Sequence, residues 1–325
     1  MLAAWYDAQG PAGDVLRVGE LPEPQPGPGE VRVQVAVSGV NPGDTKKRRG
    51  WLGSSMPFPL VIPHSDAAGV IDAVGDGVDE GRIGERVWVY GAQSYRAFGT
   101  AAQFTAVPEY MAVPLPDHVS DDLGASVGIP GITAHRAVFV DGPVDGAVVL
   151  VHGVLGGVGS MAAQLARWAG ATVIGTVRRS SDLPRVDPLS VSHAVALDDD
   201  AIGAIRDLAP DGVNRIVEVS MSDNADLDVE VVANNAVIAA YATRQDRTEI
   251  PFWPLLFANV TLRLIGSDDV PVTAKRQAAR DLTAAAAVGA LRVDIAQRFP
   301  LEQIADSHER VDSGGGGRVL VTIPQ

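Results

Sequence analysis

The stretch VVLVHGVLGGVG, residues 148–159, determines how the rest of this sequence is interpreted. Its branched apolar run Val148–Val151 favours a buried strand and leads into a cluster of glycines. From Ser160 onward apolar residues recur at helical spacing, and Gly170 is the expected end of that helix. Residues 171–177 are again apolar and predict a second strand. The predicted order is therefore strand, tight glycine turn, helix, strand.

The glycines of this stretch suit a turn that binds phosphate. They let the backbone turn sharply, and the N–H groups and dipole of the following helix N-terminus favour a pyrophosphate. A glycine turn between a predicted strand and a predicted helix is typical of dinucleotide-binding proteins. The alternative is a tight turn that binds nothing. The expected contacts are Gly153, Gly156, Gly157, Val158 and Gly159.

The composition describes a large, acidic chain without cysteine. Its 325 residues are enough for two domains, and 46% hydrophobic against 20% charged residues allows a sizeable core. The absence of cysteine excludes disulfides, thiolate metal sites and a catalytic thiol. A net charge of −14 argues against a nucleic-acid or acidic-membrane surface, although a local basic pocket is compatible with it. Because neither a transmembrane run nor a signal-peptide pattern is present, we expect a soluble cytoplasmic protein.

The first third of the chain predicts short strands joined by turns. Residues 31–37 alternate between apolar and polar side chains, which indicates a half-buried strand. Residues 41–45 predict a turn with a short helix, and the basic run Lys46–Arg49 predicts a solvated face. Residues 61–75 predict a turn and a strand broken by glycine. Strands at this spacing favour a small barrel-like β domain.

Taken in order, the motifs of this chain resemble the medium-chain dehydrogenase/reductase superfamily, and within it the zinc-free quinone oxidoreductase (zeta-crystallin-like) branch. The motifs are a proline-rich turn, VNPGDT at 40–45, AAGVIDAVG at 67–75, GERV at 84–87 and GGVG at 156–159. The branch's pattern around the glycine turn is matched by Gly146, Leu150, Gly156, Gly157, Gly159, Gln164 and Arg167. Departures from that pattern are Ala147, Val154 and Leu155. The resemblance covers nearly the whole chain.

The resemblance implies an α/β fold, with a Rossmann-type doubly wound parallel sheet and a GroES-like β-barrel catalytic domain. Residues 1–122 and 267–325 are expected to form the catalytic domain, and residues 123–266 the dinucleotide-binding domain. Residues 318–323 are expected to be a closing strand that returns to the first domain. The strand at 260–267 resembles the one that pairs across the two-fold axis of the family's dimers, so we expect a homodimer.

The residues at the family's metal positions predict an enzyme without metal. Zinc-dependent relatives place Cys, His and a further Cys or acid around the catalytic ion. Here Asn41 stands at the first position and Ser65–Asp66 at the next, and the four-cysteine lobe is absent. Because catalytic zinc usually has three protein ligands, His64 is expected to line the substrate pocket or to form hydrogen bonds instead. Without a Lewis acid, the expected reaction is reduction of an activated acceptor, a quinone or a conjugated enone.

The residues after the second predicted strand favour NADPH as the cofactor. A site that prefers NAD carries Asp or Glu about 20 residues after the glycines, but this chain has Thr176, Arg178 and Arg179 there. Arginine offers charged, bidentate donors suited to a 2′-phosphate, and a solvated arginine pair is the alternative.

The resemblance implies further cofactor contacts outside the glycine turn. Thr133 corresponds to a polar contact with the nicotinamide, and its alternative role is a helix cap. Arg318 corresponds to a contact with the pyrophosphate, and its alternative is a surface role. The contacts near the carboxamide are Tyr241, Ala242, Gly266 and Ser267. His152 adjoins the turn and could touch the cofactor, but it is not counted among the expected contacts. His308 has no partner that the sequence identifies and is expected to be structural.

The resemblance also implies hydride transfer from NADPH to the acceptor. A fixed donor lowers the barrier by stabilising charge on the acceptor oxygen; Asn41 is the first candidate and Lys46 the second. The family often has tyrosines at the positions of Lys46 and Leu52, so their absence leaves the proton donor open, with water as one source. Side chains for an aromatic acceptor pocket, unless they are core, are Trp51, Phe58, Phe252, Trp253 and Phe257.

Three functions stay open on the sequence alone. The first is an NADPH:quinone oxidoreductase. The second is an enoyl reductase of the same fold, acting on an enone or an enoyl thioester. The third is a non-catalytic NADPH-binding or structural protein, as the lens crystallins of this branch are. The glycines and the arginine pair favour a working cofactor site.

Overall fold

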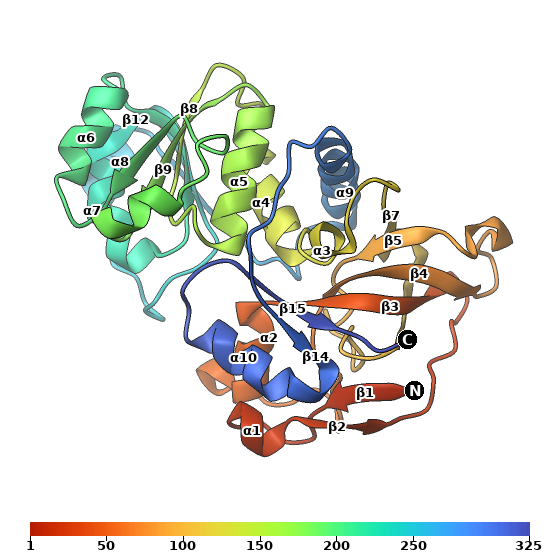
Figure 1. Cartoon of the computed structure of the whole chain (residues 1–325). Helices are drawn as coiled ribbons and strands as arrows, with labels where there is room; N and C mark the ends of the chain where they lie inside the picture. The colour runs from red at the N-terminus through yellow and green to blue at the C-terminus, as the bar shows by residue number, and fades with distance from the viewer. The chain divides into compact units, whose positions relative to one another are not determined.

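The computed structural model describes residues 1–325 and divides into two compact units, each described here by itself (Figure 1). Unit 1 comprises Met1–Pro130 and Ala279–Gln325, and unit 2 comprises Gly131–Ala278. The domain limits expected from the sequence lie shortly before these boundaries, and the roles assigned to the two domains stay predictions. No helix is both long enough and apolar enough to cross a membrane.

Unit 2 is built on a six-stranded parallel sheet with the order β10-β9-β8-β11-β12-β13. Counted along the chain this order is 3-2-1-4-5-6, which is that of a dinucleotide-binding doubly wound fold. The strands are β8 (Val148–Val151), β9 (Thr172–Val177), β10 (His193–Ala196), β11 (Val213–Glu218), β12 (Val232–Ala240) and β13 (Thr261–Leu264). The predicted Rossmann-type sheet is confirmed. Its order reverses between β8 and β11, and ligands of such sheets bind outside the carboxyl ends at this switch point.

Helices cover the sheet of unit 2 through a continuous apolar core. Side chains of the central strands, including Leu150 and Ile216, pack with Ile205 of α6, Met221 of α7 and Leu255 of α8. The helices are α4 (Ile129–Phe139), which begins in unit 1, α5 (Gly157–Trp168), α6 (Ala201–Leu208), α7 (Met221–Val231), α8 (Phe252–Phe257) and α9 (Val272–Ala287), which ends in unit 1; a 3-10 turn covers Ser180–Arg185.

The glycine stretch folds as strand, turn, helix and strand, but its helix begins earlier than the predicted Ser160. Gly156 takes the N-cap position and α5 starts at Gly157, because the first N–H groups of a helix need no intrahelical partner. Gly153 has a φ of +69°, a conformation that favours glycine. A Cβ added at Gly159 would lie 2.3 Å from Gly153 O. These glycines therefore let the helix pack closely on the turn.

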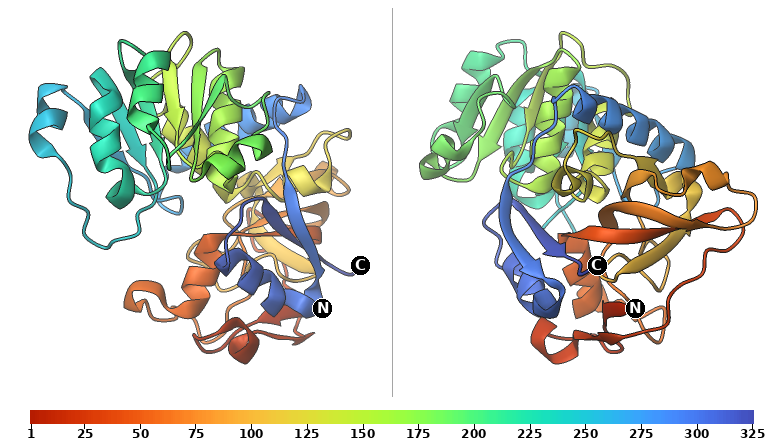
Figure 2. Two further views of the ribbon diagram at one scale, coloured as in Figure 1. Left: turned by 60° about the vertical axis from the view of Figure 1, so that its left-hand side comes forward. Right: turned by 45° about the vertical axis from the view of Figure 1, so that its right-hand side comes forward.

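Unit 1 is built on a mainly antiparallel seven-stranded sheet, in which the predicted closing strand β15 lies between β3 and β14 (Figure 2). Its order is β14-β15-β3-β4-β5-β7, and β6 also pairs with β3. The strands are β3 (Glu30–Val40), β4 (Asp66–Val74), β5 (Arg86–Val89), β6 (Phe104–Pro108), β7 (Ala112–Pro114), β14 (Ile295–Pro300) and β15 (Arg318–Thr322), and β1 (Leu2–Trp5) and β2 (Arg17–Glu20) form a separate pair. The helices are α1 (Ala12–Val15), α2 (Pro42–Arg49), α3 (Asp121–Gly124) and α10 (Ile304–Asp312), with 3-10 turns at Trp51–Gly53, Glu80–Arg82, Glu109–Met111 and Leu301–Gln303.

Two local predictions for unit 1 are wrong. Strand β4 is not broken at Gly69; a Cβ added there would lie 2.1 Å from Gln34 O, so the glycine lets β3 approach closely. The basic run in α2 is not simply a solvated face, because Arg48 is only 1% exposed. Its guanidinium donates to Gly10 O and, at 3.0 Å, to Asp312 Oδ2 of α10. Arg48 therefore holds α2 against α10.

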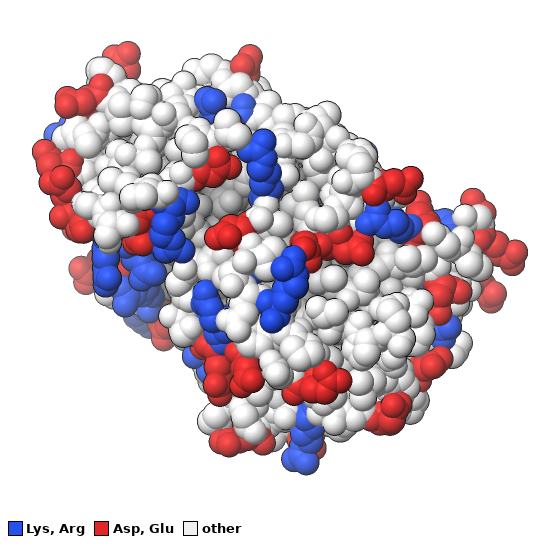
Figure 3. Space-filling model, in the orientation of Figure 1, with Lys and Arg blue, Asp and Glu red and all other residues white.

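Acidic and basic side chains are interspersed over most of the face drawn in Figure 3, and a group of basic side chains lies at its left edge. This distribution agrees with the net charge of −14. It gives no support to a general nucleic-acid surface on that face.

Candidate active site

The predicted cofactor residues of unit 2 gather at one edge of the parallel sheet. Because the carboxyl ends of parallel strands meet at the same edge, residues that follow different strands become neighbours there. They are Gly153–Gly159 after β8, Thr176–Arg179 at the end of β9, Tyr241–Ala242 after β12 and Gly266–Ser267 after β13. Thr133 lies buried within α4. The individual contacts of these residues with a cofactor stay predictions.

The N-terminus of α5 carries backbone donors suited to an anion. The first intrahelical bond runs from Ser160 N–H to Gly156 O at 2.9 Å. The N–H groups of Gly157, Val158 and Gly159 precede that bond, and no side chain caps this end. The dipole of the 12-residue helix adds partial positive charge at the same point. These residues therefore fit the pyrophosphate of a dinucleotide.

Arg178 and Arg179 follow β9 as exposed side chains that make no ion pair in the structure. The next residue, Ser180, anchors the loop by donating its N–H and its hydroxyl to Asp198 Oδ1 at 2.8 and 2.7 Å. The hydroxyl bond is the main cause that lowers the pKa of Asp198, and Arg179 contributes to the same effect. The bonds to Asp198 thus fix the loop after β9, while both guanidinium groups remain in solvent, where a phosphate can reach them.

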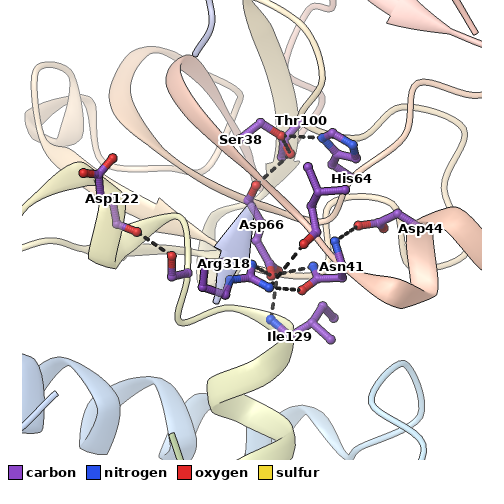
Figure 4. A network of polar contacts seen from close by, with 11 residues as sticks. Ser38, Asn41, Asp44, His64, Asp66, Thr100, Asp122, Ile129 and Arg318 are labelled. Carbon is purple, nitrogen blue, oxygen red and sulfur yellow. Dashed lines mark hydrogen bonds and ion pairs between the residues drawn. The ribbon is translucent and has the colours of Figure 1, made fainter. Parts of the chain in front are cut away.

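In unit 1, Asn41 lies at the N-cap of α2 with both ends of its side-chain amide engaged (Figure 4). Its Nδ2 donates to Asp66 Oδ2 at 2.8 Å, and its Oδ1 accepts from Arg318 Nη1 at 2.9 Å. Its backbone N–H donates to Asp44 Oδ2 at 2.7 Å, which forms a capping box. Asn41 is 4% exposed, so its amide is fixed in orientation and one Nδ2 hydrogen is left for another acceptor.

A buried ion pair, Asp66 with Arg318, lies behind Asn41. Asp66 Oδ2 is 3.8 Å from Arg318 Nη2, and Asp66 Oδ1 caps α4 by accepting from Ile129 N–H at 2.8 Å. A Cβ added at Gly128 would lie 2.1 Å from that oxygen, so glycine is needed there. Arg318 is 5% exposed and its Nε and Nη2 have no hydrogen-bond acceptor. The alternative that Arg318 is a surface residue is wrong; its contact with a pyrophosphate stays a prediction.

His64 is fully buried, and both of its ring nitrogens face protein groups. Thr100 Oγ1 donates its only hydrogen to Asp66 O at 2.8 Å. Ser38 Oγ must therefore donate to Thr100 Oγ1 at 2.7 Å. Ser38 Oγ then accepts from His64 Nδ1 at 2.9 Å. His64 Nε2 then accepts from His308 Nε2 at 3.0 Å. Burial, with Arg318 as a second cause, lowers the pKa of His64 to about 3, which keeps the ring neutral.

His308, for which the sequence identifies no partner, contacts His64 because α10 and the turn before β4 pack together in unit 1. The predicted role of His64 in a substrate pocket stays a prediction.

The residues around Asn41 do not fit a zinc ion. Zinc needs deprotonated ligands with open lone pairs, but the nitrogens of His64 and both side-chain oxygens of Asp66 are already engaged. The guanidinium of Arg318 also places a fixed positive charge beside Asp66. A second cation there would be repelled. No step of the chemistry is therefore assigned to a metal.

Asp44 is a buried acid beside Asn41 that the sequence interpretation did not single out. The pKa of Asp44 is raised to about 7. Burial is the main cause and Asp66 adds to it, whereas Lys47, the Asn41 N–H and Arg318 oppose the shift. Asp44 is therefore partly protonated at neutral pH and can hold or release a proton there. Its place three residues after an N-cap asparagine is a capping-box signal, which explains why the sequence indicates structure rather than chemistry.

The aromatic residues predicted for the acceptor pocket have different surroundings. The Lys46 Nζ lies 4.4 Å from the centre of the half-exposed Trp51 ring, and burial followed by Arg49 lowers the pKa of Lys46. Phe58 packs against a small core cluster in unit 1. The remaining aromatic side chains, which are exposed on α8 of unit 2, are Phe252, Trp253 and Phe257. The pocket itself stays a prediction.

A doubly wound dinucleotide-binding sheet joined to an antiparallel β unit defines the medium-chain dehydrogenase/reductase class. The sequence profile of the alcohol dehydrogenase GroES-like domain matches residues 27–117, and that of the zinc-binding dehydrogenases matches residues 157–293. A quinone oxidoreductase from Rattus norvegicus is 31% identical over 308 residues, covering 92% of this chain and 91% of the relative. One from Homo sapiens is 29% identical and covers 98% and 96%.

Among solved structures, a mycobacterial protein in complex with NADPH is similar, with a TM-score of 0.85 at 26% identity over 99% of this chain and all of the other. The chain belongs to the quinone oxidoreductase branch of the medium-chain dehydrogenase/reductase superfamily. It is accordingly an oxidoreductase that uses a nicotinamide cofactor and acts on a small molecule.

Proposed function

We propose that this oxidoreductase transfers a hydride from NADPH to a quinone without the help of a metal. The observation that carries the proposal is the Asn41 amide, which Asp66 and Arg318 hold as a fixed, uncharged donor. The buried guanidinium of Arg318 lies beside it. The names of the rat and human relatives, both quinone oxidoreductases, support a quinone as the acceptor.

The cofactor, when bound, supplies the hydride, and the residues of this chain manage the charge and the proton that follow. Negative charge develops on the acceptor oxygen, and the second Nδ2 hydrogen of Asn41 is the donor we assign to it. Arg318 donates to Asn41 Oδ1, which draws electron density from the amide and strengthens Nδ2–H as a donor. Asp44 supplies a proton, and a hydride with this one proton converts the quinone into the hydroquinone.

An enoyl reductase is kept as an alternative, because the acceptor oxygen of an enone or an enoyl thioester would need the same donor. A structural role without turnover is kept as a second alternative. A screen of NADPH oxidation with quinones, small enones and enoyl thioesters separates them. We expect the highest kcat/KM with quinones. The enoyl reductase function would be favoured by faster turnover of thioesters, and a structural role by NADPH binding without turnover of any acceptor. The cytoplasmic location stays a prediction.

Metal independence gives a direct prediction. We expect activity with NADPH and a quinone to be unchanged after exhaustive chelation, because Arg318 places a positive charge beside Asp66 and both side-chain oxygens of Asp66 already accept hydrogen bonds. Elemental analysis and activity are measured on the same dialysed sample. Stoichiometric zinc in the purified protein, with activity that disappears when the zinc is removed and returns with it, would contradict the prediction.

The edge strand β13 carries our proposal of a homodimer. It ends the six-stranded sheet, and its side chains Leu262 and Leu264 are 37% and 76% exposed. Since Ile265 N–H donates inward to Ala240 O, strand alternation turns the N–H groups of Leu262 and Leu264 outward. An apolar edge with open donors favours pairing with a second copy about a two-fold axis. The alternative is an edge covered by the protein's own loop.

Replacing Leu262 by Pro is expected to abolish the dimer, because it removes an outward donor and adds steric conflict at the joint. The inward bonds of β13 to β12 should survive, so light scattering should report monomers or aggregates in place of dimers. Leu262→Ala keeps the N–H and is the matched control. A wild-type protein that is monomeric at micromolar concentration would rule the arrangement out.

A further inference from the structure

We propose that His152 is a positioning residue for the phosphate-binding turn, acting through the hydroxyl of Thr176 on the backbone of Gly153. The inference rests on the proposed NADPH function and adds to it a set of side chains beneath the turn. Neither the predicted cofactor contacts nor the mechanism above uses His152.

His152 belongs to a polar cluster that is closed to solvent at the switch point of the sheet. His152 follows β8, Thr176 lies near the end of β9, Glu218 ends β11 and Asp228 lies on α7, and none of the four is exposed. The His152 Nδ1 is 3.0 Å from Thr176 Oγ1, and its Nε2 is 2.9 Å from Asp228 Oδ1. Glu218 Oε2 lies 3.5 Å from the same Nε2. The imidazole thus connects the ends of three strands to α7.

The direction of each hydrogen bond follows from the one donor whose hydrogen is fixed. Gly153 N–H donates to Thr176 Oγ1 at 3.3 Å. His152 Nδ1 is the acceptor that the structure offers to the hydroxyl hydrogen of Thr176, so in the neutral ring we assign Nδ1 as the unprotonated nitrogen. The ring proton sits on Nε2 and is donated to Asp228 Oδ1. The result is an ordered series from Gly153 through Thr176 and His152 to Asp228, with the tautomer assigned from the network.

The carboxylates around the ring keep its proton on the Nε2 side. Burial opposes a charge on His152, but Asp228 and Glu218 outweigh it and raise its pKa. Burial raises the pKa of Glu218 to about 7, and Glu218 accepts from Ser220 N–H and from Asn224 Nδ2. Tyr241, the remaining titratable group against this cluster, has its pKa raised by burial and by Glu218.

The same atoms of His152, Glu218 and Asp228 lie within 4.8 Å of one another and could in principle hold a metal ion. The hydrogen bonds favour the positioning role, because both ring nitrogens and both Glu218 oxygens already have partners. Asp228 Oδ2 alone has none. A metal at this cluster is therefore an outcome that the experiment must test.

The cluster acts on the part of the turn that sets the direction of α5. Thr176 ties the turn to β9 twice, through the Gly153 bond to its hydroxyl and through Val154 N–H, which donates to Thr176 O at 3.1 Å. Gly153 holds a φ of +69°, and its O accepts from Gly156 N–H at 2.9 Å. Loss of the hydroxyl bond would loosen the residue from which the helix N-terminus and its donors are placed.

The test compares Thr176→Val, which keeps the side-chain shape, with wild type by titration of NADPH, NADH and adenosine 2′-monophosphate. We expect Thr176→Val to weaken NADPH and NADH equally, by about tenfold for one buried hydrogen bond. Adenosine 2′-monophosphate, which lacks the pyrophosphate, should bind as to wild type. His152→Phe should give the same pattern. Thr176→Ser, which keeps the hydroxyl, and His152→Gln, which keeps a hydrogen-bonding side chain, should bind NADPH and NADH as wild type does. The exposed Thr172→Val on the same strand is the control.

Unchanged NADPH and NADH affinity in a folded Thr176→Val variant would overturn the inference while leaving the proposed function intact. Stoichiometric zinc or manganese that is lost in His152→Phe would also overturn it, by showing a metal site. If wild type binds neither dinucleotide, the proposed function fails and the inference fails with it.

Discussion

Replacing both Arg178 and Arg179 by Ala is expected to weaken NADPH binding by at least roughly a hundredfold and to leave NADH binding nearly unchanged. A hydrogen bond to a charged group is worth about 1.5–3 kcal/mol, and two guanidinium groups serve one 2′-phosphate. Both side chains are exposed and make no ion pair, so their removal breaks no contact that supports the fold. Titration of each cofactor by fluorescence or calorimetry measures the effect.

The matched control for the arginine pair is Arg206→Ala in the same unit. Arg206 is an exposed arginine of α6 that pairs with Glu230, away from the strand ends. The Arg206→Ala variant should bind both NADPH and NADH as wild type does. Equal affinity of the unmodified protein for NADPH and NADH would refute the choice of NADPH. A double variant that loses NADH as strongly as NADPH would show that these arginines act on the shape of the site instead.

Replacing Asp44 by Asn is expected to lower kcat by about 100- to 10,000-fold, the range typical of a lost general acid. Asparagine still offers an oxygen to the Asn41 N–H, so the cap of α2 should survive. In wild type the protonated form of Asp44 is the active one. Because burial raises its pKa to about 7, kcat/KM should be constant below that pH and fall about tenfold per unit above it. Asp44→Asn should lose this dependence.

Steady-state rates with one quinone over a pH series test the Asp44 prediction, with NADPH affinity measured in parallel. Asp306→Asn is the control, since Asp306 is also an acid in the first turn of a helix, α10, but is exposed. A variant Asp44→Asn with the wild-type rate and pH profile would return water to the role of proton donor. A large loss of NADPH affinity would indicate a structural role for Asp44.

The sequence predicts the dinucleotide-binding sheet well, because its signals are local. A run such as Val148–Val151 favours a buried strand, and glycines between a strand and a helix are typical of a dinucleotide-binding turn. The first residue of α5 is harder to predict, since glycine has low helix propensity. Gly157 is tolerated as the first helical residue because its N–H needs no intrahelical partner there. Gly69 likewise suggests a break in β4, and only the position of Gln34 shows why it is not one.

The candidate site is harder to predict from the sequence, because its contacts join residues that are far apart in the chain. Asn41, Asp66 and Arg318 come from three separate segments, and only the pairing of β15 with β3 brings Arg318 to the other two. The partner of His64 lies 244 positions away in α10. The raised pKa of Asp44 depends on burial, which no local pattern states. The resemblance to the family therefore identified Asn41, whereas its supports appear only in the fold.

The most direct test of the account is a single-turnover experiment with wild-type protein, bound NADPH and excess quinone, in the presence of a chelator. Stopped-flow absorbance should show NADPH consumed in one exponential phase, far faster than in buffer, with one hydroquinone formed for each NADPH oxidised. An NADPH signal that decays no faster than in buffer, or turnover that appears only after zinc is added, would contradict a metal-independent transfer of hydride from NADPH to a quinone.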